Sequence, residues 1–102
     1  MAASVLLNNV MANGPGLALD CTNKKRALLR ITGKFHADVV FEASLDGVDY
    51  FSYSGRANGA GSRVAVVSAP GYVVFEVEPI VYLRPKVSRY ESGAITVVGY
   101  AE

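Results

Sequence analysis

The sequence predicts an all-β fold, an antiparallel β-sandwich of the jelly-roll or immunoglobulin-like kind with seven to eight strands. Three observations support this prediction. Apolar and polar residues alternate with a period of two in most segments after residue 26, as in strands with one buried face. No segment carries the i, i+3, i+4, i+7 apolar spacing of an amphipathic helix. Turn residues recur at intervals of roughly eight to twelve residues, the spacing of strands in sandwiches and barrels.

The first strand of this predicted sandwich covers residues 26–31. Its apolar residues Ala27, Leu29 and Ile31 share one face of the strand, and Arg26 and Arg30 lie on the other. Residues 32–34, Thr-Gly-Lys, follow as a tight connection. We therefore expect one face of this strand to be buried and the other to meet solvent.

A β-hairpin is predicted next, from residues 39–45 and 48–53. Asp46 and Gly47 lie between the two runs, and Asp-Gly is a strong signal for a two-residue type I′ loop, because both residues tolerate positive φ angles. In that register Leu45 faces the core together with the other apolar residues of its strand. Asp46 is explained by the turn alone.

Four more runs complete the predicted strands: 63–68, 72–78, 80–84 and 94–100. Pro70 and Gly71 form a natural central pair for a turn before the second of these runs. Pro79 and Pro85 flank the third run, and neither can donate a ladder hydrogen bond. We therefore expect this run to lie at a sheet edge or to be bent at both ends.

The chain length of 102 residues corresponds to one domain. We divide it into an N-terminal arm or edge strand, residues 1–25, and a β-sandwich domain, residues 26–102. The small, nearly uncharged segment 54–62 is either a hairpin tip or a loop that becomes ordered against a neighbour. Hydrophobic residues make up 51% of the sequence, which is high for a small domain and suggests that part of the surface is buried against a partner.

The charge distribution argues against nucleic acid and membrane partners. Ten basic and nine acidic residues are interspersed and leave a formal charge of +1. The only basic cluster, residues 24–26, is short for a nucleic-acid-binding stripe and is expected to be a solvated loop. No run approaches the ~20 apolar residues of a membrane span. We expect a soluble protein made in the cytoplasm.

The sequence offers little for catalysis. Cys21 is the single cysteine, so it forms no intrachain disulfide, and we expect it to be buried or idle. His36 is the single histidine and is expected to be exposed or to cap a turn. Asp46 and Asp49 supply too few oxygen ligands for a calcium loop. We expect no enzyme activity, no catalytic residue, no cofactor and no metal site.

The six tyrosines are the remaining candidates for a binding role. Exposed aromatic rings on a sandwich face can stack on sugars, which leaves a carbohydrate-binding reading open. Tyrosine also suits half-buried strand positions and protein interfaces, where the ring packs and the hydroxyl stays hydrated. We favour the interpretation that these tyrosines lie in interfaces or in the core.

Four segments follow one another in a recognisable order: Ile31-Thr32-Gly33-Lys34-Phe35, Ser44-Leu45-Asp46-Gly47-Val48-Asp49-Tyr50, Ala69-Pro70-Gly71-Tyr72, and residues 83–97 with their Ser92-Gly93 turn. This order is similar to that of small β-sandwich virion proteins of tailed bacteriophages. In those proteins a glycine-led strand, an S-x-D-G-x-aromatic hairpin, a small-residue loop, a Pro-Gly-Tyr strand and an arginine-rich strand succeed one another. The resemblance covers roughly residues 26–100 and concerns strands and turns.

The resemblance implies a non-enzymatic virion structural protein, made in the host cytoplasm and located in the virion. A capsid decoration (cement) protein that binds and stabilises the major capsid protein is the favoured reading. A tail, baseplate or head-tail component is one alternative, and a carbohydrate-binding module is another. The partners would be the major capsid protein or neighbouring virion proteins, and a homo-oligomer, preferably a trimer, is expected. The candidate contact residues are Val5, Leu6, Leu7, Arg56 and Asn58.

Overall fold

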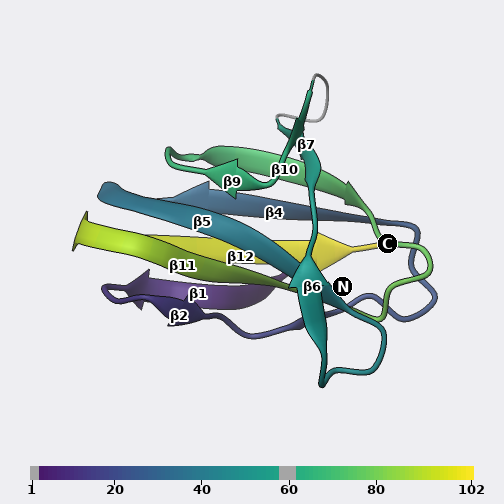
Figure 1. Cartoon of the computed structure of the whole chain (residues 1–102). Coiled ribbons are helices and arrows are strands. Elements are labelled where there is room, and N and C mark those ends of the chain that lie inside the picture. The colour runs from purple at the N-terminus through teal and green to yellow at the C-terminus, as the bar shows by residue number, and fades with distance from the viewer. Residues whose placement is uncertain (1–2, 58–61) are drawn as a thin grey trace.

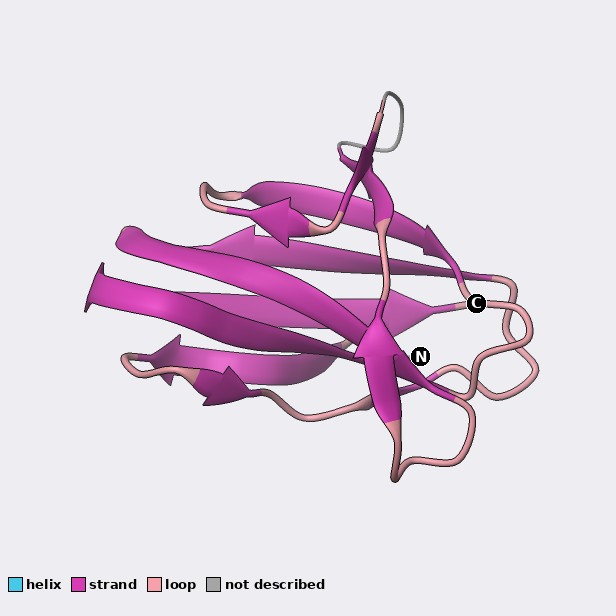
Figure 2. Ribbon diagram, viewed as in Figure 1, coloured by secondary structure: helices cyan, strands magenta, loops and turns pink. Residues whose placement is uncertain are grey.

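The computed structural model describes residues 3–57 and 62–102. Within these residues the regular secondary structure consists of β-strands alone. Two antiparallel sheets pack face to face, which confirms the predicted all-β sandwich (Figure 1). Figure 2 shows the same view with strands and loops distinguished. The strands are β1 (Ser4–Val10), β2 (Gly14–Pro15), β3 (Leu19–Asp20), β4 (Arg26–Thr32), β5 (Phe35–Ser44), β6 (Tyr50–Ser52), β7 (Gly55–Ala57), β8 (Arg63–Val64), β9 (Val66–Val67), β10 (Gly71–Glu76), β11 (Tyr82–Gly93) and β12 (Ile95–Ala101).

The strand order identifies the sandwich as a jelly roll. The first sheet has the order β1-β12-β4-β10-β7-β8, and the second has the order β2-β11-β5-β6, with β3 also on β11 and β9 also on β5. Strands from the beginning of the chain pair with strands from its end in a nested series: β1 with β12, β2 with β11, β4 with β10 and β5 with β6. This nesting is that of a long hairpin rolled up into two sheets. Of the two kinds of sandwich that the sequence left open, the structure has the jelly roll.

The number of strand positions agrees with the predicted seven to eight, although the number of strand segments is larger. In the described parts of the chain, β2 and β3 pair with successive stretches of β11 and so occupy one position of the roll. The short strands β7, β8 and β9 belong to the excursion between β6 and β10. Together with this shared position, the strands β1, β4, β5, β6, β10, β11 and β12 make up an eight-stranded jelly roll.

The N-terminal segment supplies the edge strand β1 of the first sheet. Ser4 and Val5 pair with Gly99 and Val98, but the next pair is Leu7 with Val97, so Leu6 is an extra residue in a β-bulge. The bulge interrupts the alternation of the strand. Consequently two consecutive leucines, Leu6 and Leu7, both point into the core, where they are 4% and 3% exposed.

The core lies between the two sheets and is built by alternate residues of their strands. The rings of Phe41 in β5 and Phe75 in β10 meet edge to face, with centroids 5.0 Å apart. The ring of Tyr53 stacks on that of Phe75, with centroids 6.2 Å apart. The fully buried large side chains of the sandwich include Leu29, Ile31, Val39, Val73, Leu83, Val87, Ile95 and Val97. This set follows the predicted period-two pattern in the central strands.

The hairpin between β5 and β6 differs from the prediction. Ser44 pairs with Tyr50, so the loop has five residues, 45–49, and the predicted two-residue type I′ turn is wrong. Gly47 has a φ of 81°, but Asp46 has no positive φ, whereas a type I′ turn requires both. Leu45 also points outward, with 60% of its surface exposed, because β5 ends one residue before it.

Side-chain hydrogen bonds explain why the longer loop forms. The Asp46 carboxylate accepts the backbone N–H groups of Val48 at 2.8 Å and Asp49 at 3.0 Å. The Ser44 hydroxyl accepts the N–H of Gly47 at 2.8 Å and donates to the Asp46 carboxylate at 3.0 Å. Polar side chains here replace the strand-to-strand bonds that a tighter turn would make.

This loop leads to a prediction on pH dependence. The hydrogen bonds from Val48, Asp49 and Ser44 lower the pKa of the Asp46 carboxyl below its ordinary value. The charged form is therefore favoured by folding, and its contribution is present above the unfolded-state pKa and lost as pH falls through the lower folded-state pKa. We expect Asp46→Asn to reduce stability slightly at pH 7. Chemical denaturation of both proteins from pH 7 to pH 2 should show this difference vanish in acid; a difference independent of pH would contradict the assignment.

Pro85 is the second departure from the sequence analysis. It lies within β11, which has β5 on one side and β2 and β3 on the other, so the expected edge position is not observed. Its carbonyl accepts the N–H of Gly16 at 2.8 Å, and Gly16 lies in the break between β2 and β3. In an antiparallel ladder a residue's N–H and C=O point to the same neighbour. The missing N–H of Pro85 therefore faces the interruption of the neighbouring strand.

Candidate interaction surface

The exposed side of the first sheet, called the outer face below, gathers apolar, aromatic and arginine side chains from strands far apart in the sequence. The strands β1, β12, β4, β10 and β7 lie side by side in this sheet, and β8 continues it at one edge. The residues of the outer face include Val5, Arg26, Leu28, Arg30, Thr32, Arg56, Arg63, Tyr72, Val74, Glu76, Thr96, Val98, Tyr100 and Glu102.

The strand register arranges the apolar residues of the outer face in two rows. The first row crosses the sheet in the order Val5, Val98, Arg30 and Tyr72. The second row runs in parallel and holds Tyr100, Leu28, Val74 and Arg56. Directly opposed residues on one face of antiparallel strands have Cβ atoms about 4.5–5.5 Å apart, so each row is a continuous band. Each band joins apolar and tyrosine side chains to an arginine.

Exposed apolar side chains in these bands are unusual for strands that face solvent. Val5 is 48% exposed, and Leu28 and Tyr72 are each 39% exposed. Leu28 lines two hollows of the outer face, one of about 250 Å³ beside Tyr100 and one of about 570 Å³ beside Tyr72. A sheet face with an apolar floor and polar surroundings has the composition of a protein interface.

The charges of the outer face are mainly positive. Arg26 lies between Glu102 and Glu76 in a third row, and its guanidinium is 3.5 Å from the Glu102 carboxylate. Both side chains of this pair are more than 60% exposed, so the ion pair contributes little to stability. Arg56 and Arg63 pair directly across β7 and β8. The outer face thus carries four arginines against two glutamates.

The structure brings together two of the five residues that the sequence analysis proposed as partner contacts. Val5 and Arg56 both lie on the outer face, at opposite ends of its two rows. Leu6 and Leu7 are buried in the core of the same chain, and this intramolecular burial accounts for the apolar character that suggested a partner contact. Asn58 lies outside the described residues.

Sequence reasoning kept Tyr72 and Tyr100 as binding candidates among the six tyrosines, but it missed Leu28, Arg30, Val74 and Val98. A signal was present: in β4 and β10 the positions between the buried residues should be polar, yet Leu28 and Val74 occupy them. Apolar residues on both faces of a strand indicate burial on both sides. A local pattern does not show that these strands are neighbours in one sheet.

The single cysteine and the single histidine lie apart from this surface. Cys21 is fully buried, and this burial raises its pKa to about 11, so little reactive thiolate is present at neutral pH. His36 lies in β5 and is exposed. Among residues 3–57 and 62–102, no three His, Cys, Asp or Glu side chains are grouped as metal ligands. The same residues contain no helix of the length and hydrophobicity needed to cross a membrane.

Several tyrosines have structural roles that occupy their rings or hydroxyls. The Arg84 guanidinium lies 3.6 Å from the ring centroid of Tyr50, and it also bonds the Glu42 carboxylate at 2.9 Å. Tyr53 stacks in the core, and its hydroxyl donates to the backbone carbonyl of Glu76. The Tyr90 hydroxyl donates to the carbonyl of Gly93 at 2.7 Å. Tyr72 and Tyr100 are the tyrosines on the outer face.

No protein-family model matches the sequence, and no curated protein matches it. The fold is similar to the crystal structure of the SPBc2 prophage-derived protein YomS, with a TM-score of 0.87. The two chains are 14% identical, and the match covers 98% of this chain and 90% of that chain. At this identity the likeness shows a shared fold over nearly the whole of both chains.

Proposed function

We propose that this chain is a non-enzymatic structural protein of a phage virion, most simply a capsid decoration (cement) protein that binds the major capsid protein through its outer face. The observation that carries the proposal is the pair of apolar bands with their arginines, a combination that protein interfaces favour. The prophage origin of YomS, which shares the fold, supports the phage assignment. The resemblance of residues 26–100 to small virion proteins supports it independently.

The mechanism of such a protein is binding without chemistry. A ligand that binds only the assembled shell stabilises it by mass action, and the effect grows with occupancy. A specific contact of standard size buries roughly 800 Å² per partner. This is a modest share of the chain's 5852 Å² surface, so one sheet face can supply it. The chain would be made in the host cytoplasm and act in the virion.

Capsid binding is testable with purified shells that lack this protein. We expect the wild-type chain to sediment with the shells and to raise their melting temperature. The double variant Leu28→Ser/Tyr72→Ser should bind at least about tenfold more weakly, since truncation of a central interface residue costs more than about 1 kcal/mol. Val66→Ser is a matched control, because Val66 is 48% exposed and lies in β9 of the other sheet.

Parallel binding assays with tails and with a glycan array test the alternatives. Sedimentation with tails but not with shells would favour a tail, baseplate or head-tail component. Binding to a glycan array that Tyr72→Ala abolishes would favour a carbohydrate-binding module. Equal binding of wild type and the double variant to shells would show that the outer face is not the contact, and no binding to any virion part would overturn the proposal.

A further inference from the structure

We propose that two copies of this chain form a symmetric dimer by pairing their β6 strands, Tyr50–Ser52, edge to edge. The pairing would join the second sheets of the two copies into one continuous sheet. The contact lies at the edge of the second sheet and does not use the outer face of the first. It therefore goes beyond the proposed function and leaves the outer face available for the capsid.

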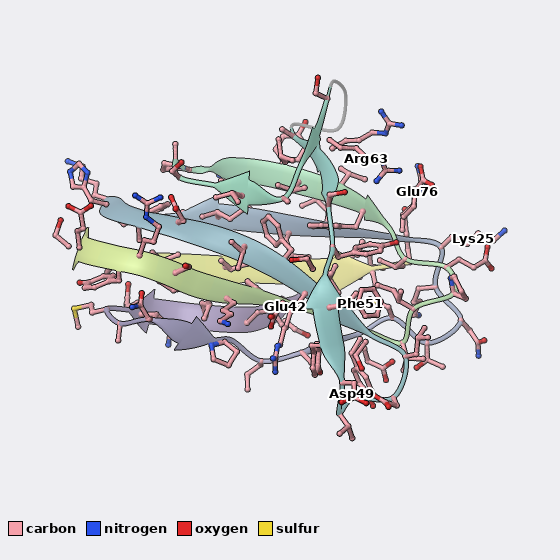
Figure 3. All side chains as sticks on the ribbon, viewed as in Figure 1. Lys25, Glu42, Asp49, Phe51, Arg63 and Glu76 are labelled. Atoms are coloured by element: carbon pink, nitrogen blue, oxygen red, sulfur yellow. The ribbon has the colours of Figure 1, made fainter. Side chains whose placement is uncertain are left out.

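The strand β6 ends the second sheet, and only one of its two edges is paired. The order of that sheet is β2-β11-β5-β6, so β5 occupies one side of β6. Within residues 3–57 and 62–102 no strand pairs with the other side. Phe51 and Ser52 are both exposed. Figure 3 shows Phe51 beside β6 and Asp49 on the loop below it. The free edge is therefore open to a further strand.

The register of β6 on β5 determines which backbone groups point to the free edge. Just beyond β6, the N–H of Tyr53 donates to the carbonyl of Phe41 in β5 at 2.9 Å. In an antiparallel ladder the N–H and C=O of one residue point to the same neighbour, and successive residues point to opposite neighbours. Phe51, two residues before Tyr53, therefore also bonds to β5. The N–H and C=O groups of Tyr50 and Ser52 point away from β5.

These outward groups are complementary to themselves. A second β6, rotated by 180° about an axis beside Phe51, places Tyr50 of each copy opposite Ser52 of the other. Residues opposed in this way exchange both of their N–H···O=C bonds. Every outward N–H and C=O of β6 then has a partner. Phe51 lies opposite its own copy, in the closer type of pair that makes no backbone bonds. A second copy of the chain therefore satisfies the whole edge.

The side chains of β6 suit this pairing. Phe51 is 44% exposed, and its ring meets only one other ring, that of Tyr53, at 6.3 Å between centroids. A second Phe51 directly opposite would cover apolar surface, and such aromatic cross-strand pairs are stabilising. The Arg84 guanidinium lies 3.6 Å from the ring centroid of Tyr50. This contact orders the strand before it docks, which lowers the entropic cost of binding.

Two other edge strands carry features that protect them from pairing, whereas β6 does not. Bulges, prolines and charged side chains are the usual means of blocking a free edge. The bulge at Leu6 interrupts β1, and β2 contains Pro15. The three residues of β6 include no proline or charge, and their register on β5 is regular. Because β6 is short, its backbone bonds are few, and we expect a reversible dimer that depends on protein concentration.

Sedimentation velocity and light scattering on the purified full-length chain measure this association over a series of concentrations. We expect the mass to rise to that of two chains and no further, since a symmetric contact closes. Ser52→Pro removes the outward N–H of each copy and no bond to β5, so it should raise the dissociation constant at least about tenfold. Ser52→Ala keeps this N–H and should behave as wild type. Thermal unfolding checks that each variant is folded.

Opposite charges at position 51 test the symmetry of the contact. Phe51→Asp and Phe51→Lys each place like charges opposite each other, so each variant alone should remain monomeric where the wild type is dimeric. Mixed together, the two variants place an aspartate opposite a lysine and should form a one-to-one dimer. A mixture that stays monomeric would overturn the inference. So would a wild type that stays monomeric, or one that forms a trimer, the state that the sequence analysis favoured.

Shell sedimentation of the same variants separates this inference from the proposed function. Monomeric Ser52→Pro should still bind shells through its intact outer face. A wild-type dimer that ignores shells would refute only the decoration role. A wild-type monomer that binds shells would refute only the dimer, and if Ser52→Pro then lost shell binding, the free edge of β6 would be a contact with the capsid protein instead.

Discussion

Replacing Phe75 with alanine should lower the free energy of unfolding by about 3–5 kcal/mol, the range measured for large aromatic truncations in protein cores. Phe75 is fully buried in the core of the sandwich, where its ring packs against two others: Phe41 at 5.0 Å and Tyr53 at 6.2 Å between centroids. Its removal would leave a cavity between the two sheets and would end both aromatic contacts. Urea unfolding monitored by far-ultraviolet circular dichroism measures the loss.

Two companion variants sharpen this test. Phe75→Leu keeps an apolar side chain in the same space and should lose clearly less stability than Phe75→Ala, because it leaves a smaller cavity. Tyr72→Ala removes an aromatic residue from the same strand but from its outer face, and it should change stability much less. If Phe75→Ala and Tyr72→Ala had similar effects, the packing of the two sheets at Phe75 would be refuted.

Replacing Leu7 with alanine should lower the free energy of unfolding by about 2–5 kcal/mol. The sequence alone offered Leu7 as a contact with a partner protein, whereas in the structure its side chain points from the edge strand β1 into the core and is 3% exposed. If Leu7 contacted only a partner protein, the isolated Leu7→Ala chain would be as stable as the wild type. The stability of the isolated chain therefore distinguishes the two roles, and differential scanning calorimetry on the purified protein is sufficient to measure it.

Val5 is the control for this second prediction. It lies in the same strand, two residues away, but points to the outer face and is 48% exposed. Val5→Ala should change stability by no more than about 0.5 kcal/mol, as is usual at surface positions. A stable Leu7→Ala protein with weakened assembly would instead restore Leu7 to the partner surface and contradict the packing of β1.

Local patterns predicted the strands well where buried apolar residues occupy every second position. Residues 26–31 were predicted as a strand, and β4 covers Arg26–Thr32; residues 72–78 were predicted, and β10 covers Gly71–Glu76. The prediction failed where side chains make the decisive bonds. Asp46-Gly47 has the composition of a two-residue turn, but the Ser44 hydroxyl and the Asp46 carboxylate together stabilise a five-residue loop.

The N-terminal strand shows a second kind of failure. Two consecutive leucines cannot both face the core of a regular strand, because alternate side chains point to opposite faces. Neither leucine received an intramolecular assignment from the sequence, and both were proposed as partner contacts. The bulge at Leu6 removes the difficulty, and its existence depends on the register of β1 against β12, which are separated by most of the chain.

The fold class follows from local properties of the sequence: apolar residues alternate with a period of two, no segment has a helical spacing, and turns are frequent. The tertiary structure alone decided the jelly-roll order, the burial of Leu6 and Leu7, and the union of Val5, Leu28, Tyr72 and Arg56 on one face. Strand pairing between distant segments is selected by packing and hydrogen bonding summed over the whole chain, and no local window contains that sum. The candidate surface is a product of that pairing, so it became visible only when the strands were placed side by side.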